Sequence, residues 1–186
     1  MDLDYTLILK AIQYKTVDLR HDVDLSMDAA FEMAKLESYC GVNSTYYIRL
    51  DCDYYNPMSA KNVWRINEMA QAGHGIGLHI DTTFIEDEAQ LIEYINEAKT
   101  FMPFTMFTFH INTDKTKGFT KTHYAGLENK SLVEKYISDS RGNWSKRNFD
   151  FIKNNDNFTL LIHPEWWMYK GTKHSIIKQA IKEILP

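Results

Sequence analysis

The chain has 186 residues, of which 44% are hydrophobic and 25% are charged, and its formal net charge is -4. This balance is typical of a globular domain and excludes a disordered chain and a fibrous repeat. The slight acidic excess, without a dominant basic stripe, argues against a nucleic-acid partner.

No apolar run approaches the roughly 20 residues that a membrane-spanning helix needs. Residues 1–4 are acidic where a signal peptide would be basic, so a cytoplasmic protein is expected. Cys40 and Cys52 are too few for a disulfide framework. We expect one domain over residues 1–186, and the sequence leaves open whether copies of it form a homo-oligomer.

The periodicity of apolar residues predicts alternating helices and strands. In chain order they are a helix over 3–13, a strand over 16–20, a helix capped by Ser26 and ending near Cys40, a strand over 42–50, a helix over 59–72, a strand over 76–80, a helix over 87–101, strands over 105–109 and 133–138, a helix over 145–154, a strand over 158–162 and a helix over 173–185. The polar stretch 112–130 is too long for a simple connector and is expected to be a working loop. Strands separated by helices predict βαβ units and a parallel sheet or barrel.

Ionisable side chains stand at the ends of several expected strands. They lie in segments 20–24 and 77–81, in segment 107–110, at Asp139 and at His163. The carboxyl ends of parallel strands gather at one edge, where such folds carry their functional sites. Because buried charge is costly unless it is paired or bound to a metal, we expect these groups to converge on a divalent cation.

The first of these segments places two carboxylates on one side of a strand. Asp22 and Asp24 would lie about 6–7 Å apart, so one could bind a metal while the other takes a proton from water. Arg20 on the same side could restrain the pair electrostatically. Taken alone, Asp22 and Asp24 are explained equally well as a pair of surface acids in the loop that caps the helix at Ser26.

Two histidines complete a candidate ligand set. Alone, His79 and His110 fit satisfied core histidines better than metal ligands, but with Asp24 they form the mixed nitrogen and oxygen set that catalytic zinc favours. His74 follows a helix end and is interpreted as a turn residue. The glycine-rich segment 73–77 precedes a strand rather than opening a helix, so nucleotide binding is rejected.

Aromatic residues lie close to the last two strand ends. Trp166 and Trp167 follow His163 and are expected in core or lid packing, with a stacking wall for a sugar ring as the alternative. The segment 139–144 is either a polar functional loop with one aromatic residue or a solvated loop.

Four motifs in order resemble the polysaccharide deacetylase (NodB-homology) superfamily, in its divergent branch with an Arg-His-Asp-Val-Asp first motif. They lie at 19–24, 73–79, 136–140 with Trp144, and 160–164, and the resemblance covers residues 16–167. It implies a distorted (β/α)7 barrel whose members remove N- or O-acyl groups from sugars with a divalent metal, commonly zinc.

The resemblance also implies a role for each matching residue. These are Asp22 as catalytic base, Asp24 and His79 as metal ligands, His163 as the general acid, Trp144 as the hydrophobic residue beside the substrate and Asp139 as the acid of its motif. Arg20, Asp139 and Trp144 are accordingly expected at the substrate.

The sequence departs from the family pattern at two places. Thr83 stands where the second metal histidine should fall, and His110 stands where an arginine-proline motif is expected. Our hypothesis is that His110 supplies the third ligand, with Asp81 as second choice. If neither does, the domain would be a non-catalytic relative that binds a saccharide or acts as a scaffold.

The expected function is therefore metal-dependent removal of an N-acetyl-type group from a saccharide. The joint presence of Asp22, Asp24 and His163 favours the enzyme over the non-catalytic alternative. Without an export signal, the substrate would be a nucleotide- or lipid-linked sugar in surface-glycan biosynthesis. Because 186 residues is short for this superfamily, substrate-binding loops would be trimmed or supplied by a partner subunit.

Overall fold

The structure is a computed structural model that describes residues 4–110 and 116–182. Its elements are α1 (Tyr5–Ile12), β1 (Val17–Val23), α2 (Met27–Tyr39), β2 (Thr45–Ile48), α3 (Ala60–Gln71), β3 (Gly75–Ile80), α4 (Glu88–Phe101), β4 (Met106–Phe109), the 3-10 helix η1 (Thr116–Gly118), β5 (His123–Tyr124), β6 (Leu127–Asn129), β7 (Tyr136–Ser138), the 3-10 helix η2 (Ser140–Gly142), α5 (Lys146–Asn154), β8 (Phe158–Ile162), α6 (Glu165–Met168) and α7 (Lys173–Ile181).

The strands form one curled sheet in the order β5-β6-β4-β3-β2-β1-β8-β7. All neighbouring strands pair in parallel except β5 and β6. Within the described residues the ladder does not join β5 to β7, so the barrel is distorted and open between these edges. The prediction of a parallel α/β barrel-type fold is confirmed.

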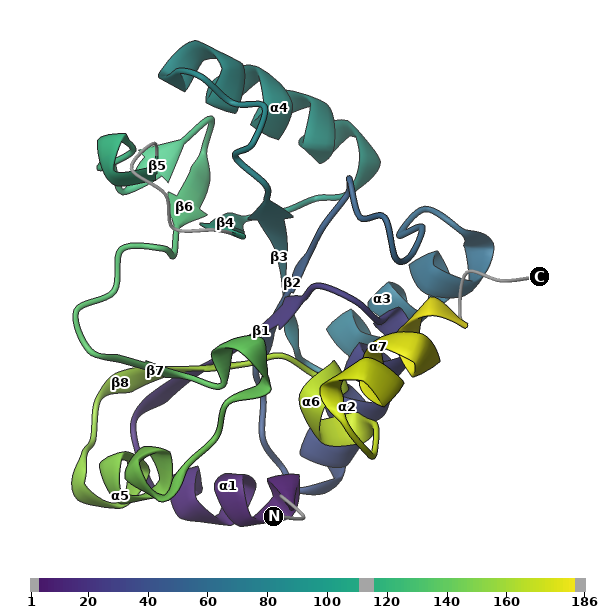
Figure 1. Ribbon diagram of the computed structural model, residues 1–186. Helices are drawn as coiled ribbons and strands as arrows, with labels where there is room; N and C mark the ends of the chain where they lie inside the picture. Colours follow the sequence, from purple (N-terminus) through teal and green to yellow (C-terminus); the bar gives the residue numbers. More distant parts are fainter. Residues whose placement is uncertain (1–3, 111–115, 183–186) are drawn as a thin grey trace.

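Helices pack on the outside of this sheet. Figure 1 shows α2, α3, α6 and α7 gathered on one side, α1 beside α5 at the bottom, and α4 at the opposite end. No helix in the two described stretches is long and apolar enough to cross a bilayer.

Local sequence signals fix the helix ends. The Ser26 side chain accepts a hydrogen bond from the backbone N–H of Ala29, as expected for the residue that caps α2. Gly41 lies just past the end of α2 with φ +70°, a conformation that costs glycine little. Asp87 caps α4 in the same way as Ser26 caps α2.

The largest correction concerns residues 112–130. Residues 112–115 lie outside the described part, but the rest is not an irregular loop: it contains η1 and a β5–β6 hairpin. The hairpin turns at Ala125 and Gly126, both with positive φ, which is the geometry of a two-residue hairpin turn. Strands of two and three residues are too short to show a period of two, so the pattern did not reveal them.

Other boundaries shift by a few residues. β1 continues beyond the expected end at residue 20 to Val23, because its last residues remain buried between β2 and β8. β2 and β7 are shorter than expected, and the one-turn helix α6 was not expected at all. The extension of β1 matters most, since it sets the direction of Asp22 and Asp24.

Candidate active site and metal centre

The site lies where β1, β3, β4 and β8 end. Asp24, His110 and His163 each follow the last residues of their strands, and Asp22 and His79 stand just before the ends of theirs. These strands are neighbours or near neighbours in one parallel sheet, so side chains far apart in sequence meet at its carboxyl edge.

Three possible metal ligands form a tight triangle. Asp24 Oδ1 lies 3.4 Å from His79 Nε2 and 3.0 Å from His110 Nδ1, and the two imidazole nitrogens are 3.3 Å apart. Atoms bound about 2.0–2.1 Å from a tetrahedral zinc lie about 3.3–3.4 Å from one another. The spacing therefore matches three ligands of one ion.

The chemistry of the three groups also fits a metal. Asp24 Oδ1 is buried and, within the described residues, makes no well-aligned hydrogen bond despite its close histidine neighbours. Burial opposes the charge of Asp24, but its contacts with His110 and His79 and the charge of His163 hold its pKa well below the usual range. An ionised carboxylate with an unused oxygen is a suitable cation ligand.

His79 is held in the orientation that a ligand needs. Its Nδ1 lies 2.8 Å from Thr108 Oγ1 on the adjacent strand, at the position where β3 and β4 pair His79 with Thr108. A partner of this kind fixes the ring and leaves Nε2 directed at the triangle.

The position left by the missing second histidine is not part of this triangle. Thr83 is exposed, and its backbone N–H and hydroxyl both donate to Asp81 Oδ1, at 2.9 and 2.6 Å. The other oxygen of Asp81 accepts from Arg49 at 3.1 Å. Of the two candidates for a third ligand, the geometry thus favours His110 over Asp81.

Asp22 is paired with an arginine from its own strand. Arg20 donates to both carboxylate oxygens, at 2.8 and 2.7 Å, and its guanidinium lies over the ring of Tyr47. Burial opposes the charge of Asp22, but Arg20, His79 and His163 lower its pKa below the usual value. The expectation that Arg20 restrains the acid pair is confirmed for Asp22.

His163 is bound to a buried acid. Its Nδ1 lies 2.6 Å from Asp139 Oδ1, while Asp139 Oδ2 accepts from the Trp167 indole at 2.6 Å. Burial opposes a charge on His163, but Asp139, with Glu165 and Asp24, raises its pKa to about 10. The ring is therefore an imidazolium at neutral pH, and its Nε2 lies 3.6 Å from Asp24 Oδ2.

The predicted substrate residues fall into two groups. A cavity of about 360 Å³ opens over the site and is lined, among the described residues, by Arg20, Asp22, Phe109, His110, Ser131, Val133, Tyr136, Ser140, Leu161 and His163. Asp139 and Trp144 stand behind it: Trp144 packs its ring edge-on against Trp167, with centroids 5.2 Å apart.

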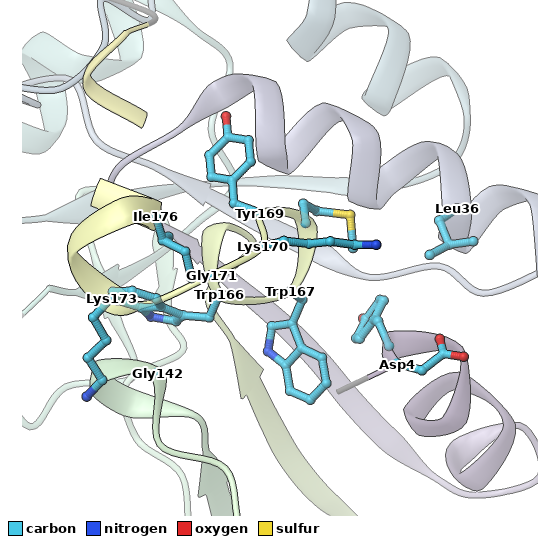
Figure 2. Close-up of a pocket in the computed structure, with 12 residues that line it drawn as sticks. Asp4, Leu36, Gly142, Trp166, Trp167, Tyr169, Lys170, Gly171, Lys173 and Ile176 are labelled. Atoms are coloured by element: carbon cyan, nitrogen blue, oxygen red, sulfur yellow. The ribbon is translucent and has the colours of Figure 1, made fainter. Parts of the chain in front are cut away.

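The tryptophans after β8 do not form a wall of that cavity. Both line a separate cavity of about 650 Å³, but Trp167 is also buried and donates its indole N–H to Asp139. Figure 2 shows this second cavity, bordered by Trp166, Lys173 and Tyr169. Core packing is thus the better description of Trp167.

Tyr136 and Ser140 line the site cavity and were not singled out from the sequence, although both lie in the motif at 136–140. That motif could therefore have indicated them as cavity residues. Nothing in the sequence indicated Phe109 and Ser131, because an apolar strand end and a serine in a polar stretch are ordinary features.

A buried polar network supports the site from behind. Glu37 of α2 is fully buried and accepts from Tyr5, His21, Ser44 and Tyr46, at 2.5 to 2.8 Å. Burial opposes its charge, but these donors, His21 foremost, lower its pKa to about 2. The apolar period of the helix places Glu37 on the buried stripe with Ala30 and Met33, but nothing in the sequence singled it out as a buried acid with four donors.

His74 belongs to the edge of this network, which corrects its interpretation as a mere turn residue. It is buried, and its Nδ1 accepts from the backbone N–H of Ser44 at 3.3 Å. Its Nε2 lies 3.0 Å from Ser38 Oγ and 3.2 Å from the carbonyl oxygen of Ala34. The ring therefore joins α2 to the start of β3.

Solved structures with a similar backbone include a deacetylase, an esterase and a mutant of a pseudoenzyme. The peptidoglycan deacetylase PdaC from Bacillus subtilis is 14% identical, with TM-score 0.57, over 91% of this chain and 84% of that one. A CE4 esterase from Streptococcus mutans is 13% identical, with TM-score 0.58, over 96% and 85%. A mutant of a CE4 family pseudoenzyme is 11% identical, with TM-score 0.57, over 91% and 63%.

These likenesses define the fold, which is that of the CE4, NodB-like deacetylases, as the sequence motifs predicted. No family model matches the sequence, and a search of curated proteins finds no match.

Proposed function

We propose that this protein is a metal-dependent hydrolase that removes an N-acetyl-type group from a saccharide. The observation that carries the proposal is the triangle of Asp24, His79 and His110, with sides of 3.0–3.4 Å. It lies between a carboxylate, Asp22, and an imidazolium, His163, which are the two groups that amide hydrolysis needs.

Asp24, His79 and His110 would hold the divalent ion, and zinc is expected for this mixed ligand set. When bound, the metal supplies Lewis-acid activation of water and of the acyl carbonyl. The Nε2 of His79, directed at the triangle, and the ionised Asp24 suit this task.

Asp22 acts as the general base. Arg20 fixes both of its oxygens and keeps it ionised, so it accepts a proton from water as the water oxygen bonds to the acyl carbon. Because Arg20 also lowers its basicity, its value as a base depends on being correctly placed.

His163 acts as the general acid. It is cationic and is held by Asp139, so it can donate the Nε2 proton to the nitrogen as the carbon–nitrogen bond breaks. Water oxygen thus goes to the acyl product and the nitrogen leaves as an amine. Asp139 and Trp144 contribute by placing His163 and Trp167, and Arg20 by placing Asp22.

The cavity supports a small substrate. At about 360 Å³ it lies at the lower end for ligand sites, which suits a single acylated sugar unit. We propose a nucleotide- or lipid-linked sugar intermediate of surface-glycan biosynthesis, acted on in the cytoplasm.

A non-catalytic, saccharide-binding role is the second candidate. The observation that favours it is Thr83, which lies outside the ligand triangle and leaves the family's second histidine without a direct replacement.

Zinc titration and acetate release separate these candidates. We expect purified protein to bind about one zinc and to release acetate from N-acetylated sugars, and Asp24→Ala or His79→Ala to abolish both. His123→Ala, an exposed histidine on β5, is the matched control. Zinc binding that survives Asp24→Ala, or no acetate from the zinc-loaded protein, would contradict the enzyme.

A further inference from the structure

Arg49 contacts the third ligand from outside the triangle. It directly follows β2, is only 9% exposed, and its guanidinium is held between two acids: Nη2 donates to Asp81 at 3.1 Å and Nε to Asp51 at 3.4 Å. In this position its Nη1 lies 3.3 Å from His110 Nε2.

This contact determines where His110 carries its proton. An arginine nitrogen can only donate, so His110 Nε2 must accept and the neutral ring carries its proton on Nδ1. That Nδ1–H faces two possible acceptors, Asp24 Oδ1 at 3.0 Å and His79 Nε2 at 3.3 Å.

The two histidines are therefore not equally prepared for a metal. A ligand atom must offer a lone pair to the ion. His79 Nε2 is directed at the triangle by the contact of its other nitrogen with Thr108, whereas His110 Nδ1 bears the proton. To bind, His110 must have its proton on Nε2 instead, where Arg49 Nη1 now donates, and two donors cannot share that contact.

We propose that Arg49 is a positioning residue that restricts metal binding by His110, and that metal uptake moves the His110 proton from Nδ1 to Nε2 and displaces Arg49 Nη1. This deepens the proposed function, since it rests on His110 as a ligand. His110 can therefore act as the third ligand only after Arg49 Nη1 is displaced. This matters because the family's second metal histidine is missing from this site.

Zinc affinity, measured by calorimetry with zinc alone, tests the proposal. Arg49→Gln removes the donor and supplies an acceptor for Nε2–H, so zinc should bind about 10- to 100-fold more tightly, the size of effect usual for a group that orients a metal ligand. Arg49→Met removes the donor only and should give a smaller gain. Arg49→Lys keeps a cationic donor and should give none, and Arg147→Gln, an exposed arginine on α5, is the control.

Removing the positive charge of Arg49 also strengthens cation binding, because it removes a repulsion that does not depend on His110. The same Arg49 variants are therefore also made in a protein that carries His110→Ala. If Arg49 acts through His110, the gain from Arg49→Met is smaller in that background, because only the part due to lost charge repulsion remains. An equal gain in both backgrounds, or no gain from Arg49→Gln in a variant that melts normally, overturns the proposal.

Nitrogen-15 NMR of the metal-free wild type provides a readout that needs no variant at Arg49. The His110 ring should show a protonated Nδ1 and an unprotonated Nε2, and the reverse tautomer overturns the proposal. If His110→Ala leaves zinc affinity unchanged, the proposed ligand set itself fails. If that variant weakens zinc binding while the Arg49 variants do not strengthen it, only the role of Arg49 fails.

Discussion

Replacing Asp139 by asparagine would reveal how His163 is kept charged. The Asp139 carboxylate is fully buried and accepts from His163 Nδ1 and Trp167 Nε1, each at 2.6 Å, and from the backbone N–H of His163 at 3.1 Å. Asparagine keeps the shape but loses the charge, and its amide nitrogen must face one of these donors. We therefore expect Asp139→Asn to lower both the pKa of His163 and the stability of the fold.

The magnitude follows from the pKa of His163. Burial alone would lower it, but Asp139 foremost, with Glu165 and Asp24, raises it to about 10. Against an unfolded value of about 6.5, this contributes on the order of 5 kcal/mol to the stability of the metal-free protein when complete, and about 4 kcal/mol at pH 7. The folded-state pKa is raised, so the contribution is complete below pH about 6.5 and is lost as the pH rises toward about 10.

In Asp139→Asn the His163 ring remains buried, but the negative charge of its partner is lost. The pKa of His163 should then fall below its ordinary value, and the free energy of unfolding at pH 7 should drop by about 4 kcal/mol, which is what the raised pKa contributes at that pH. The decline in stability between pH about 6.5 and 10 should largely disappear. Deacetylation should slow by about 10²- to 10⁴-fold, the usual contribution of a general acid.

The assay is an NMR titration of the His163 ring in metal-free protein, together with urea unfolding from pH 6 to 10. Asp150→Asn, an exposed acid on α5, serves as the control. If His163 still titrates near pH 10 in Asp139→Asn, or if wild-type stability stays constant over this pH range, Asp139 does not hold the charge on His163 and the reasoning is wrong.

Three further substitutions test the supports of the site. Glu37→Gln removes the charge that its buried donors share, and should cost about 3–5 kcal/mol in urea unfolding. Arg20→Met leaves Asp22 without its cation, so the pKa of Asp22 should rise and the acid side of the pH–activity profile should move to higher pH. Gly77→Ala would bring a Cβ within 2.5 Å of the Tyr47 ring, and should cost about 1–3 kcal/mol and reduce activity by shifting the ring beneath the guanidinium.

Each of these has a matched control in an unconstrained position: Glu134→Gln, Arg147→Met and Gly118→Ala, since no atom lies within 4 Å of a Cβ at Gly118. A loss in Glu37→Gln no larger than in its control would show that the buried charge is not needed. If the acid side of the pH–activity profile does not shift in Arg20→Met, Arg20 does not control the pKa of Asp22. Full stability of Gly77→Ala would mean that Tyr47 moves freely.

Much of the fold was predictable because its signals are local. Cap residues such as Ser26 and the apolar period of each segment act within one helix turn or one strand, and they predicted the alternation of elements correctly. The β5–β6 hairpin and α6 were not predicted because each element is too short for its period to repeat.

The candidate site was predictable for a different reason. Ionisable residues at strand ends are costly to bury, and in a parallel sheet all these ends share one edge, so Asp22, Asp24, His79, His110 and His163 were expected together. That they lie together follows from sheet order, which the alternation of strands and helices implies.

The sequence by itself thus determined the class of fold and the chemical groups at its edge. The tertiary structure alone decided their states: that Asp24 Oδ1 makes no aligned hydrogen bond within the described residues, that the Asp139 carboxylate keeps His163 protonated, and that Arg49 Nη1 contacts the outer nitrogen of His110. Such contacts join elements that are distant along the chain, and protonation depends on distances of a few tenths of an ångström that no sequence pattern encodes.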